Sequence, residues 1–322
     1  MQIPGPTRKF DVMIACDTCC DLVMTGNVRP QFKQIEQLVG DYSLEMGGSA
    51  TIFGSQLGKL GLRVGAIGWV GQDSFGRYIV EQLQLAGLDT TRIRTHASVK
   101  TGLGVLLSEQ NDRAILTYLG TIDATHPSDL DQNVLDSCRH WHVASYFLMK
   151  SLRDFWPEWL RECREHGVTV SLDTNWDPEN RWQGVTDLLP YVDIFLPNKN
   201  EALAITGKKS VLEAADELAR HCPFVIIKQG EKGVLARKGN KTWELRPGPD
   251  TGLPETVVDS TGAGDNFDAG FLAAYLSGEG IPDCLLLGHR CAVSSLAHLG
   301  GVRGQLWKEH VARLAATPMY VK

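Results

Sequence analysis

From about residue 140 onward, short apolar runs rich in β-branched residues alternate with segments whose apolar positions recur every three or four residues. Short apolar runs of this kind predict buried strands, and the longer period predicts helices. The predicted strands are 140–146, 168–172, 193–196 and 224–228. The predicted helices are 151–166, 211–220, 266–276 and 284–299. Strands that alternate with helices indicate a parallel sheet covered by helices.

A hairpin interrupts this alternation. Residues 233–237 and 241–245 form two β-type runs, separated by a turn that contains Gly239 and Asn240. A short turn of this composition joins antiparallel neighbours, so we expect two antiparallel strands here.

The N-terminal part of the chain has a different pattern. Residues 8–15 and 62–67 predict further strands of the main sheet, whereas 22–45 and 100–119 carry β-type runs with turn residues. These two stretches predict a small separate sheet, a candidate lid over a binding site. Such a sheet alone would expose one face, so we expect it to pair with a second copy in a homodimer.

Length and composition favour one large domain. The chain has 322 residues, of which 43% are hydrophobic, and this is enough to bury a large core. The sequence contains no repeat, low-complexity tract or linker. We therefore expect a single domain over residues 1–322, with lid segments at about 17–46 and 97–121 inserted in it.

The charge pattern argues against nucleic acid as a partner. The formal net charge is -6 and no segment is rich in Lys and Arg, whereas nucleic-acid binders carry a basic patch. No apolar run approaches the length of about 20 residues that a membrane-spanning helix needs. Residues 1–17 lack the charged start and long apolar stretch of a signal peptide. We expect a cytoplasmic protein that binds neither nucleic acid nor membrane.

Three of the eight cysteines cluster near the N-terminus. Cys16, Cys19 and Cys20 resemble half of a metal site, but no second cysteine or histidine pair follows at ligand spacing. The favoured interpretation is that they are small residues packed in a strand.

The clearest sign of chemistry is the segment 257–267, VVDSTGAGDNF. The small residues Gly262, Ala263 and Gly264 permit a tight turn into a helix, so their N–H groups can hold an anion at its N-terminus. Asp265 lies in the first helical turn, where we expect the helix dipole to keep it ionised and able to accept a proton from a hydroxyl. The alternative is that Asp265 only caps the helix. The Walker and Gly-x-Gly-x-x-Gly patterns are absent from this segment.

A second glycine pair, Gly47 and Gly48, precedes a predicted helix in which Ile52, Phe53 and Leu57 are apolar. Paired glycines permit close approach of a ligand or of another backbone. Tight packing of helix on sheet is an equally good interpretation of this segment alone.

Together, five segments resemble the ribokinase-like (PfkB) carbohydrate kinases across nearly the whole chain. In chain order, the segments are 47–48, 68–76, 198–201, 228–233 and 259–265. The resemblance implies a three-layer α/β/α fold with a mostly parallel, doubly wound sheet and a small β-sheet lid. It also implies an enzyme that transfers the γ-phosphate of ATP to a hydroxyl of a sugar or sugar-like substrate.

The resemblance assigns the phosphoryl-transfer chemistry to the glycine turn. Asp265 matches the family's general base, and the backbone of Gly262, Ala263 and Gly264 matches its anion hole. Phosphoryl transfer needs mainly positioning and charge stabilisation, so a backbone cradle, a base and Mg²⁺ suffice.

The resemblance also implies an ATP and magnesium site. Glu201 matches the residue that holds Mg²⁺ through water, and Lys228 stands where the family has Thr or Ser, so it would contact phosphate as a charge. The full set of residues assigned to the nucleotide is Asn198, Glu201, Lys228, Gly230, Gly233 and Asn266.

For the substrate, the resemblance points to residues near the lid. Asp21 matches an acidic residue that binds sugar hydroxyls, and a carboxylate suits a vicinal diol. The residues assigned to the substrate are Asp21, Gly47, Gly48, Arg113, Asp173 and Asn175. Asp259 and Thr261 resemble a monovalent-cation site of part of the family, which would hold K⁺.

Three departures from the family pattern make the pocket less polar. Ile52, Cys19 and Cys291 each stand where the family often has a polar residue. Ribose itself is therefore a doubtful substrate. A kinase of adenosine-like nucleosides is one alternative, a sugar-binding regulator without turnover is a second, and a structural scaffold is a third. The retained Asp265 and Glu201 favour the enzyme, because neither a sensor nor a scaffold needs a base.

Overall fold

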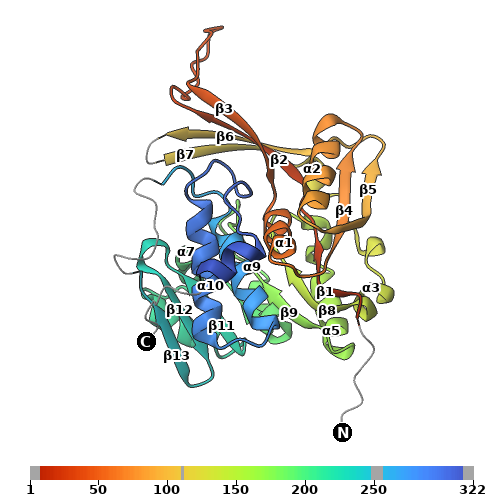
Figure 1. The fold of residues 1–322 in the computed structure, drawn as a ribbon, viewed down its shortest axis with the longest axis vertical. Helices are drawn as coiled ribbons and strands as arrows, with labels where there is room; N and C mark the ends of the chain where they lie inside the picture. The colour runs from red at the N-terminus through yellow and green to blue at the C-terminus, as the bar shows by residue number, and fades with distance from the viewer. Residues whose placement is uncertain (1–7, 110–111, 248–256, 315–322) are drawn as a thin grey trace.

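Two sheets organise the protein (Figure 1). The computed structural model describes residues 8–109, 112–247 and 257–314, and within them it contains a nine-stranded and a four-stranded sheet. The strands of the larger sheet are β1 (Phe10–Ala15), β4 (Val64–Gly71), β5 (Asp89–His96), β8 (Cys138–Val143), β9 (Thr169–Leu172), β10 (Ile194–Phe195), β11 (Phe224–Lys228), β12 (Val234–Lys238) and β13 (Lys241–Leu245). Their order is β13-β12-β11-β10-β9-β8-β1-β4-β5. The strands from β11 to β5 pair in parallel, and β12 and β13 add antiparallel neighbours at one edge.

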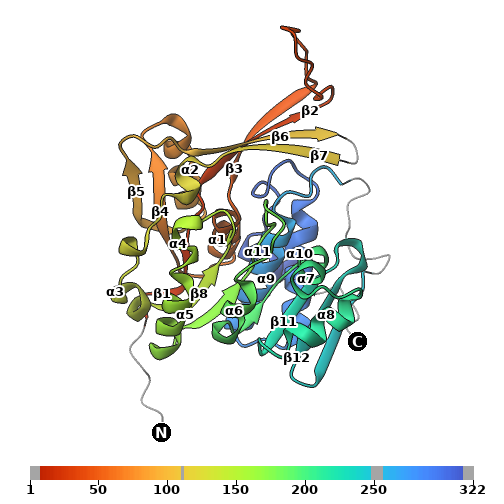
Figure 2. The ribbon, with the colours of Figure 1, turned by 180° about the vertical axis from the view of Figure 1, so that it is seen from behind.

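Helices cover both faces of this sheet, because its central strands are apolar on both sides. In β1, Met13 and Ala15 pack into one hydrophobic cluster, and Val12 and Ile14 pack into the other. The first cluster is covered by α3 (Gln132–Ser137), α4 (Lys150–Arg153), α5 (Trp156–Glu165), α6 (Val185–Leu188), α7 (Lys199–Thr206) and α8 (Val211–Leu218), several of which face the viewer in Figure 2. The second is covered by α1 (Ser49–Lys59), α2 (Ser74–Leu85), α9 (Ala263–Leu276), α10 (Ile281–Ser295) and α11 (Lys308–Leu314). The short 3-10 turns are η1 (Gly120–Asp123), η2 (Pro127–Asp129), η3 (Leu189–Tyr191) and η4 (Gly230–Lys232).

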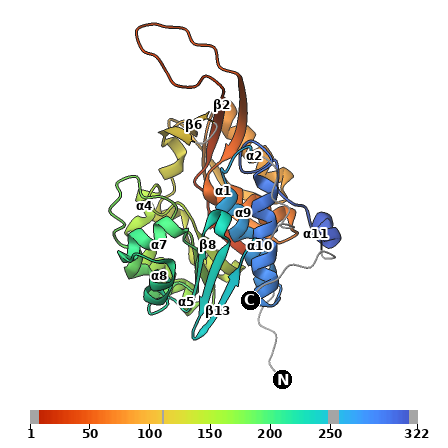
Figure 3. The same ribbon diagram turned by 90° about the vertical axis from the view of Figure 1, so that its left-hand side faces the viewer.

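The smaller sheet stands across one end of the larger one (Figures 1 and 3). Its strands are β2 (Cys19–Thr25), β3 (Asp41–Gly47), β6 (Gly102–Glu109) and β7 (Asp112–Tyr118), in the order β3-β2-β6-β7. β2 pairs antiparallel with β3 and parallel with β6. The predicted segments 17–46 and 97–121 therefore do form a separate sheet, although β3 extends one residue beyond the first of them. Its action as a lid stays a prediction.

Several predicted elements are confirmed and others are wrong. β11 and β13 have the predicted bounds, and Lys238 pairs with Lys241 across the two-residue turn. The predicted helix 151–166 is divided into α4 and α5, since Pro157 lacks an N–H group and occupies the first turn of a new helix. β8 begins two residues earlier than predicted and ends at Val143.

The clustered cysteines pack as the sequence predicted. Cys19 and Cys20 lie in β2, Cys16 follows β1, and none of the three side chains is more than 7% exposed. Within the described part of the chain, no helix combines the length and apolar character needed to cross a bilayer.

Candidate active site

A cleft of about 720 Å³ lies at the carboxyl ends of β1, β9, β10 and β11. Parallel sheets of this kind bind ligands outside the carboxyl ends of their strands. Residues of β6 and β7 bound the cleft on the side of the smaller sheet. The predicted site residues that line it are Asp21, Gly48, Asp173, Asn175, Asn198, Glu201, Lys228, Gly230, Thr261, Gly262, Gly264 and Asp265.

Helix α9 begins at this cleft. Its N-cap residue Gly262 has a φ of 72°, and a Cβ there would lie 2.7 Å from the Cα of Gly301, so only glycine fits the turn. No described side chain caps this helix end, which leaves its positive end available to an anion. Ala263 does not line the cleft, and its N–H donates to the Ser260 carbonyl oxygen within the turn. Of the predicted cradle, Gly262 and Gly264 face the cleft.

Asp265 lies in the first turn of α9 and is 8% exposed. Burial raises the pKa of Asp265 to about 8, with a smaller contribution from the charge of Asp173, whereas the Lys228 charge opposes the shift. The expectation that the helix dipole keeps this carboxyl ionised is therefore wrong at neutral pH, because burial outweighs the dipole. A pKa near neutrality is well matched to the transfer of a proton.

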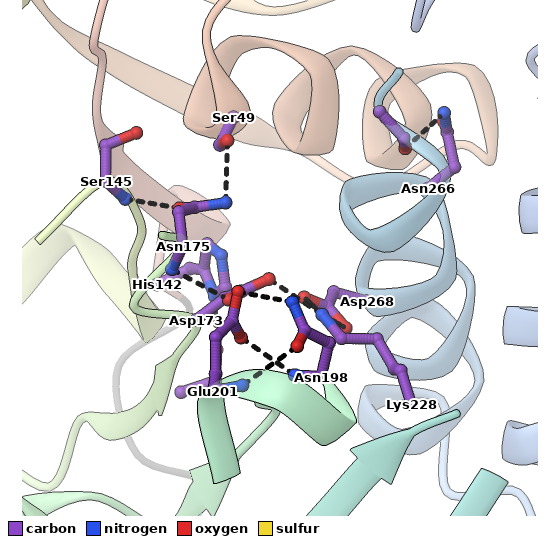
Figure 4. A network of polar contacts seen from close by, with 12 residues as sticks. Ser49, His142, Ser145, Asp173, Asn175, Asn198, Glu201, Lys228, Asn266 and Asp268 are labelled. Carbon is purple, nitrogen blue, oxygen red and sulfur yellow. Dashed lines mark hydrogen bonds and ion pairs between the residues drawn. The ribbon is translucent and has the colours of Figure 1, made fainter. Parts of the chain in front are cut away.

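Lys228 ends β11 and points its amine at two buried carboxylates (Figure 4). Its Nζ lies 2.7 Å from Asp173 Oδ2 and 2.8 Å from Asp268 Oδ2. Burial would raise the pKa of Asp173, but the Lys228 charge and hydrogen bonds outweigh it and hold this pKa below its usual value. Asp173 is therefore an ion-pair partner of Lys228 in the cleft, a role that its predicted contact with substrate did not include.

Asn175 joins two sides of the cleft. Its backbone has a φ of 55°, in the left-handed region, and its N–H donates to Asp173 Oδ1. The side-chain Oδ1 accepts from the Ser145 N–H at 2.7 Å, and Nδ2 donates to Ser49 Oγ at 2.8 Å (Figure 4). A strained backbone held by three hydrogen bonds fixes this amide in one orientation.

Asn198 and Glu201 form a capping box at the start of α7. The Asn198 N–H donates to Glu201 Oε2 at 2.8 Å, and the Glu201 N–H donates to Asn198 Oδ1 at 3.0 Å. Burial raises the pKa of Glu201 to about 7, followed in size by the charge of Asp173. The carboxylate therefore lines the cleft in a fixed orientation and gains charge near neutral pH.

Asp21 projects from β2 between two glycines on the neighbouring strands. A Cβ on Gly47 would lie 2.5 Å from the Asp21 carboxyl group, and a Cβ on Gly104 would lie 2.6 Å from its Oδ1. Gly104 is the cross-strand partner of Asp21 in β6. These glycines leave the space in which the carboxyl group reaches the cleft, so Gly47 acts through Asp21 and does not itself line the cleft.

Asp17, which the sequence analysis did not select, caps helix α1. Its carboxylate accepts from the backbone N–H groups of Ser49 at 2.8 Å and Ala50 at 3.0 Å, and from the Ser145 hydroxyl. Gly48 has a φ of 86°, and a Cβ there would lie 2.8 Å from Asp17 Oδ1. The second glycine of the pair is therefore required by the close approach of Asp17.

Two predicted nucleotide residues lie away from the cleft. Asn266 is fully buried (Figure 4), and its Nδ2 donates to the carbonyl oxygens of Gly262 and Gly301. Its side chain therefore holds the glycine turn in place from behind. Gly233 has a φ of 89°, and a Cβ there would collide with the Leu245 carbonyl oxygen, so this glycine is required by the hairpin.

The predicted cation pair lies at the base of the glycine turn. Asp259 Oδ1 accepts from the Thr261 N–H and hydroxyl, and Asp259 Oδ2 accepts from the Gly300 N–H at 2.9 Å. Asp259 thus connects two loops, and only Thr261 of the pair lines the cleft. The side chain of Arg113, also predicted to bind substrate, lies outside the described residues.

An exposed tryptophan on the wall of the cleft was also missed. Trp176 is 53% exposed, and its ring packs edge-on against Trp182 with 5.1 Å between centroids. The loop is held by the Asp177 carboxylate, which accepts from the backbone N–H groups of Glu179, Arg181 and Trp182. The sequence signal was available, because Trp176 directly follows the predicted Asn175. Ser49, Ser145 and Asp268 were missed as well.

Comparison with known proteins gives a consistent family assignment. The model of the pfkB family carbohydrate kinases matches residues 16–307. An uncharacterized sugar kinase of Archaeoglobus fulgidus is 28% identical over 253 residues, which cover 77% of this chain and 97% of that protein. The 2-dehydro-3-deoxygluconokinase of Bacillus subtilis is 26% identical over 287 residues, which cover 85% and 87% of the two chains.

The solved structures agree on the fold. The structure of a putative ribokinase II of Escherichia coli in complex with ATP and Mg²⁺ has a TM-score of 0.84 at 21% identity, and the match covers 94% of this chain and 98% of that one. The three-layer fold expected from the sequence is thus confirmed. The family match over residues 16–307 also confirms the expected class of enzyme, and the chain belongs to the pfkB family of carbohydrate kinases.

Proposed function

We propose that this protein transfers the γ-phosphoryl group of ATP to a hydroxyl group of a sugar or sugar-like substrate, with Asp265 as the general base. One observation carries the proposal. A buried carboxyl group stands in the first turn of a helix whose uncapped N-terminus opens into the same cleft as Lys228 and Asp21. A base, an anion cradle and a recognition carboxylate are thereby grouped around one space.

In this scheme Asp265 removes the proton from the acceptor hydroxyl as its oxygen attacks the γ-phosphorus. The bond to the β,γ-bridging oxygen breaks, and ADP leaves with the electron pair. Gly262 and Gly264, with Ala263 between them, place the helix N-terminus against the charge on the transferring group. The pKa of about 8 supports this role, because a base with a pKa near the working pH both loses and accepts a proton readily.

The phosphate groups would lie between the helix N-terminus and the end of β11. Lys228 would supply positive charge, and Gly230 leaves open space, since a Cβ there would meet no atom within 4 Å. Glu201 fits an indirect magnesium site, because Mg²⁺ keeps several waters and takes one or two carboxylates together with phosphate oxygens. Asn198 would orient Glu201, and the bound ion would neutralise charge on the phosphates.

The acceptor would lie between the two sheets. Asp21 can accept hydrogen bonds from two neighbouring hydroxyl groups, and Asn175 lines the same space. We assign Gly47 and Gly48 supporting roles, since each leaves room for a carboxyl group. Asp173 would act on the phosphate side through Lys228.

A nucleoside kinase is the second candidate, favoured by the apolar wall of the cleft. Trp176, Leu148, Ile122 and Leu106 line it together with Ile52. Aromatic and aliphatic side chains of this kind suit a flat apolar group such as a nucleobase. The discriminating assay compares kcat/KM for adenosine and inosine with that for ribose and fructose, in wild type and in Trp176→Ala. A preference for nucleosides that the variant loses would favour the second candidate.

Two further features of the protein are proposals. We propose a homodimer through the smaller sheet, because Tyr42, Leu116 and Tyr118 on its strands are each more than half exposed. A K⁺ site at Asp259 and Thr261 would need oxygen ligands beyond Asp259, whose carboxylate oxygens already accept hydrogen bonds. Activity in KCl compared with tetramethylammonium chloride tests that site.

The proposed function is tested by ATP-dependent phosphorylation of a panel of sugars and nucleosides. We expect one acceptor class to be phosphorylated by the wild type and not by Asp265→Asn. Binding of sugar or nucleotide without any turnover would instead support a regulator that has lost catalysis.

A further inference from the structure

The residue that contacts Lys228 most completely is Asp268, which no sequence motif had indicated. Lys228 Nζ lies 3.0 Å from Asp268 Oδ1 and 2.8 Å from Asp268 Oδ2, so both carboxylate oxygens accept from one amine. The side chains of Lys228 and Asp268 are 10% and 1% exposed. A charge so deeply buried destabilises a protein unless a partner of opposite sign is present.

The pair lies directly beside the predicted path of the phosphoryl group. A Cβ on Gly264 would be 3.4 Å from Lys228 Nζ, which places the amine against the first turn of α9. Lys228 lines the cleft, whereas Asp268 does not. Asp268 therefore holds the amine from the protein side, and Asp173, which lines the cleft, holds it from the cleft side at 2.7 Å (Figure 4).

Helix geometry ties this pair to the catalytic base. Asp265 and Asp268 are three residues apart in α9, so their side chains project from the same face of the helix. One helix thus carries both the proposed base and the anchor of the nearest cation. The Lys228 backbone is fixed as well, since its N–H donates to the Pro197 carbonyl oxygen at 3.0 Å.

We propose that Lys228 and Asp268 act as one unit, in which Lys228 presents a fixed positive charge to the transferring phosphoryl group and Asp268 is the positioning residue for its amine. This inference rests on the proposed kinase function and deepens it. An anchored ammonium stabilises the charge of a phosphoryl transition state without reorganisation at the moment of reaction. The competing explanation is that the pair only fills the core with compensated charge.

The test separates these two roles through a pair of single variants and their combination. Lys228→Met leaves the carboxyl groups of both Asp268 and Asp173 without their cation, so this variant should unfold at a lower temperature than the wild type. Asp268→Asn leaves Lys228 paired with Asp173 and should lose less stability. The double variant leaves only the Asp173 carboxylate without its cation, so it should be more stable than Lys228→Met. A purely structural pair would recover kcat together with stability.

Under our proposal the double variant is more stable than Lys228→Met, while its kcat stays lower than that of the wild type by about 100-fold or more, the effect of deleting a preorganised charge. Asp268→Asn alone should lower kcat about 10-fold or more with little change in the acceptor KM, since the amine is misplaced rather than removed. Recovery of kcat to near the wild-type value in the double variant would overturn the proposal.

A control removes a more exposed ion pair at the amino ends of the strands, away from the cleft. Asp11 and Arg63, at the amino ends of β1 and β4, bond at 2.8 Å, and Asp11→Asn combined with Arg63→Met should leave kcat unchanged. Failure of the kinase proposal has a different signature, because the wild type would then turn over no acceptor. In that event the affinity for Mg·ATP, measured by calorimetry, is compared in place of kcat. Equal affinity of the wild type and the double variant would overturn the inference.

Discussion

Replacing Asp265 with Asn removes a carboxyl group whose pKa is raised, mainly by burial, from 3.8 to about 8. Because the folded-state pKa lies above the unfolded one, the folded protein binds this proton more tightly than the unfolded chain. Between these two values stability therefore falls as pH rises. Over the roughly three units from pH 5 to pH 8, this one group lowers the free energy of unfolding by about 4 kcal/mol, at 1.36 kcal/mol per unit.

The variant lacks this titration, so its stability relative to the wild type should increase by about 4 kcal/mol between pH 5 and pH 8. Denaturant unfolding at pH 5, 6.5 and 8 measures the difference. Asp11→Asn is the matched control. The hydrogen bond from Arg63 lowers the pKa of Asp11 to about 2, so the difference between that control and the wild type should be constant over this range. If the difference in stability between Asp265→Asn and the wild type is also constant over this pH range, the raised pKa of the buried Asp265 carboxyl group is refuted.

Three further predictions concern the cleft and the smaller sheet. Gly47→Ala should raise the acceptor KM about 10-fold or more and leave the ATP KM unchanged, because the new Cβ displaces the Asp21 carboxyl group. Initial rates at varied acceptor and ATP concentrations measure both constants, and an acceptor KM equal to that of the wild type would contradict the supporting role of Gly47. Glu201→Gln should raise the Mg²⁺ concentration that gives the half-maximal rate by about 10-fold, because the residue is proposed to act through bound water. An unchanged magnesium titration would contradict the assignment of Glu201 to the metal site. Light scattering should give the mass of a dimer for the wild type and of a monomer for Leu116→Lys, since a charge on an apolar interface opposes association. A monomeric wild type would contradict the proposed interface.

The fold could be predicted where hydrophobic pattern alone decides the structure. β11 is apolar from Phe224 to Ile227 and is buried at every position, and its bounds were predicted correctly. β5, with the sequence DTTRIRTH, was not predicted because it lies at the sheet edge, where polar side chains face solvent and the apolar run is lost.

The site was predictable where adjacent residues act together. Residues 262–265 contain the turn, the helix start and the proposed base within one short segment, so a local pattern was enough. The contact of Lys228 with Asp268 joins residues 40 positions apart. It depends on where β11 ends relative to the second turn of α9, which no local pattern specifies. The raised pKa of Asp265 could not be predicted from the sequence either, because burial is a property of the folded chain.

The measurement that tests the central claim most directly is ATP-dependent phosphorylation of ribose, fructose, 2-keto-3-deoxygluconate, tagatose, inosine and adenosine by wild type and Asp265→Asn. Coupled detection of ADP and isolation of the phosphorylated acceptor give both products of the reaction. We predict turnover of at least one acceptor by the wild type, and its near-complete loss in an Asp265→Asn variant that still binds Mg·ATP by calorimetry. Near-normal turnover by Asp265→Asn would contradict the assignment of Asp265 as the base.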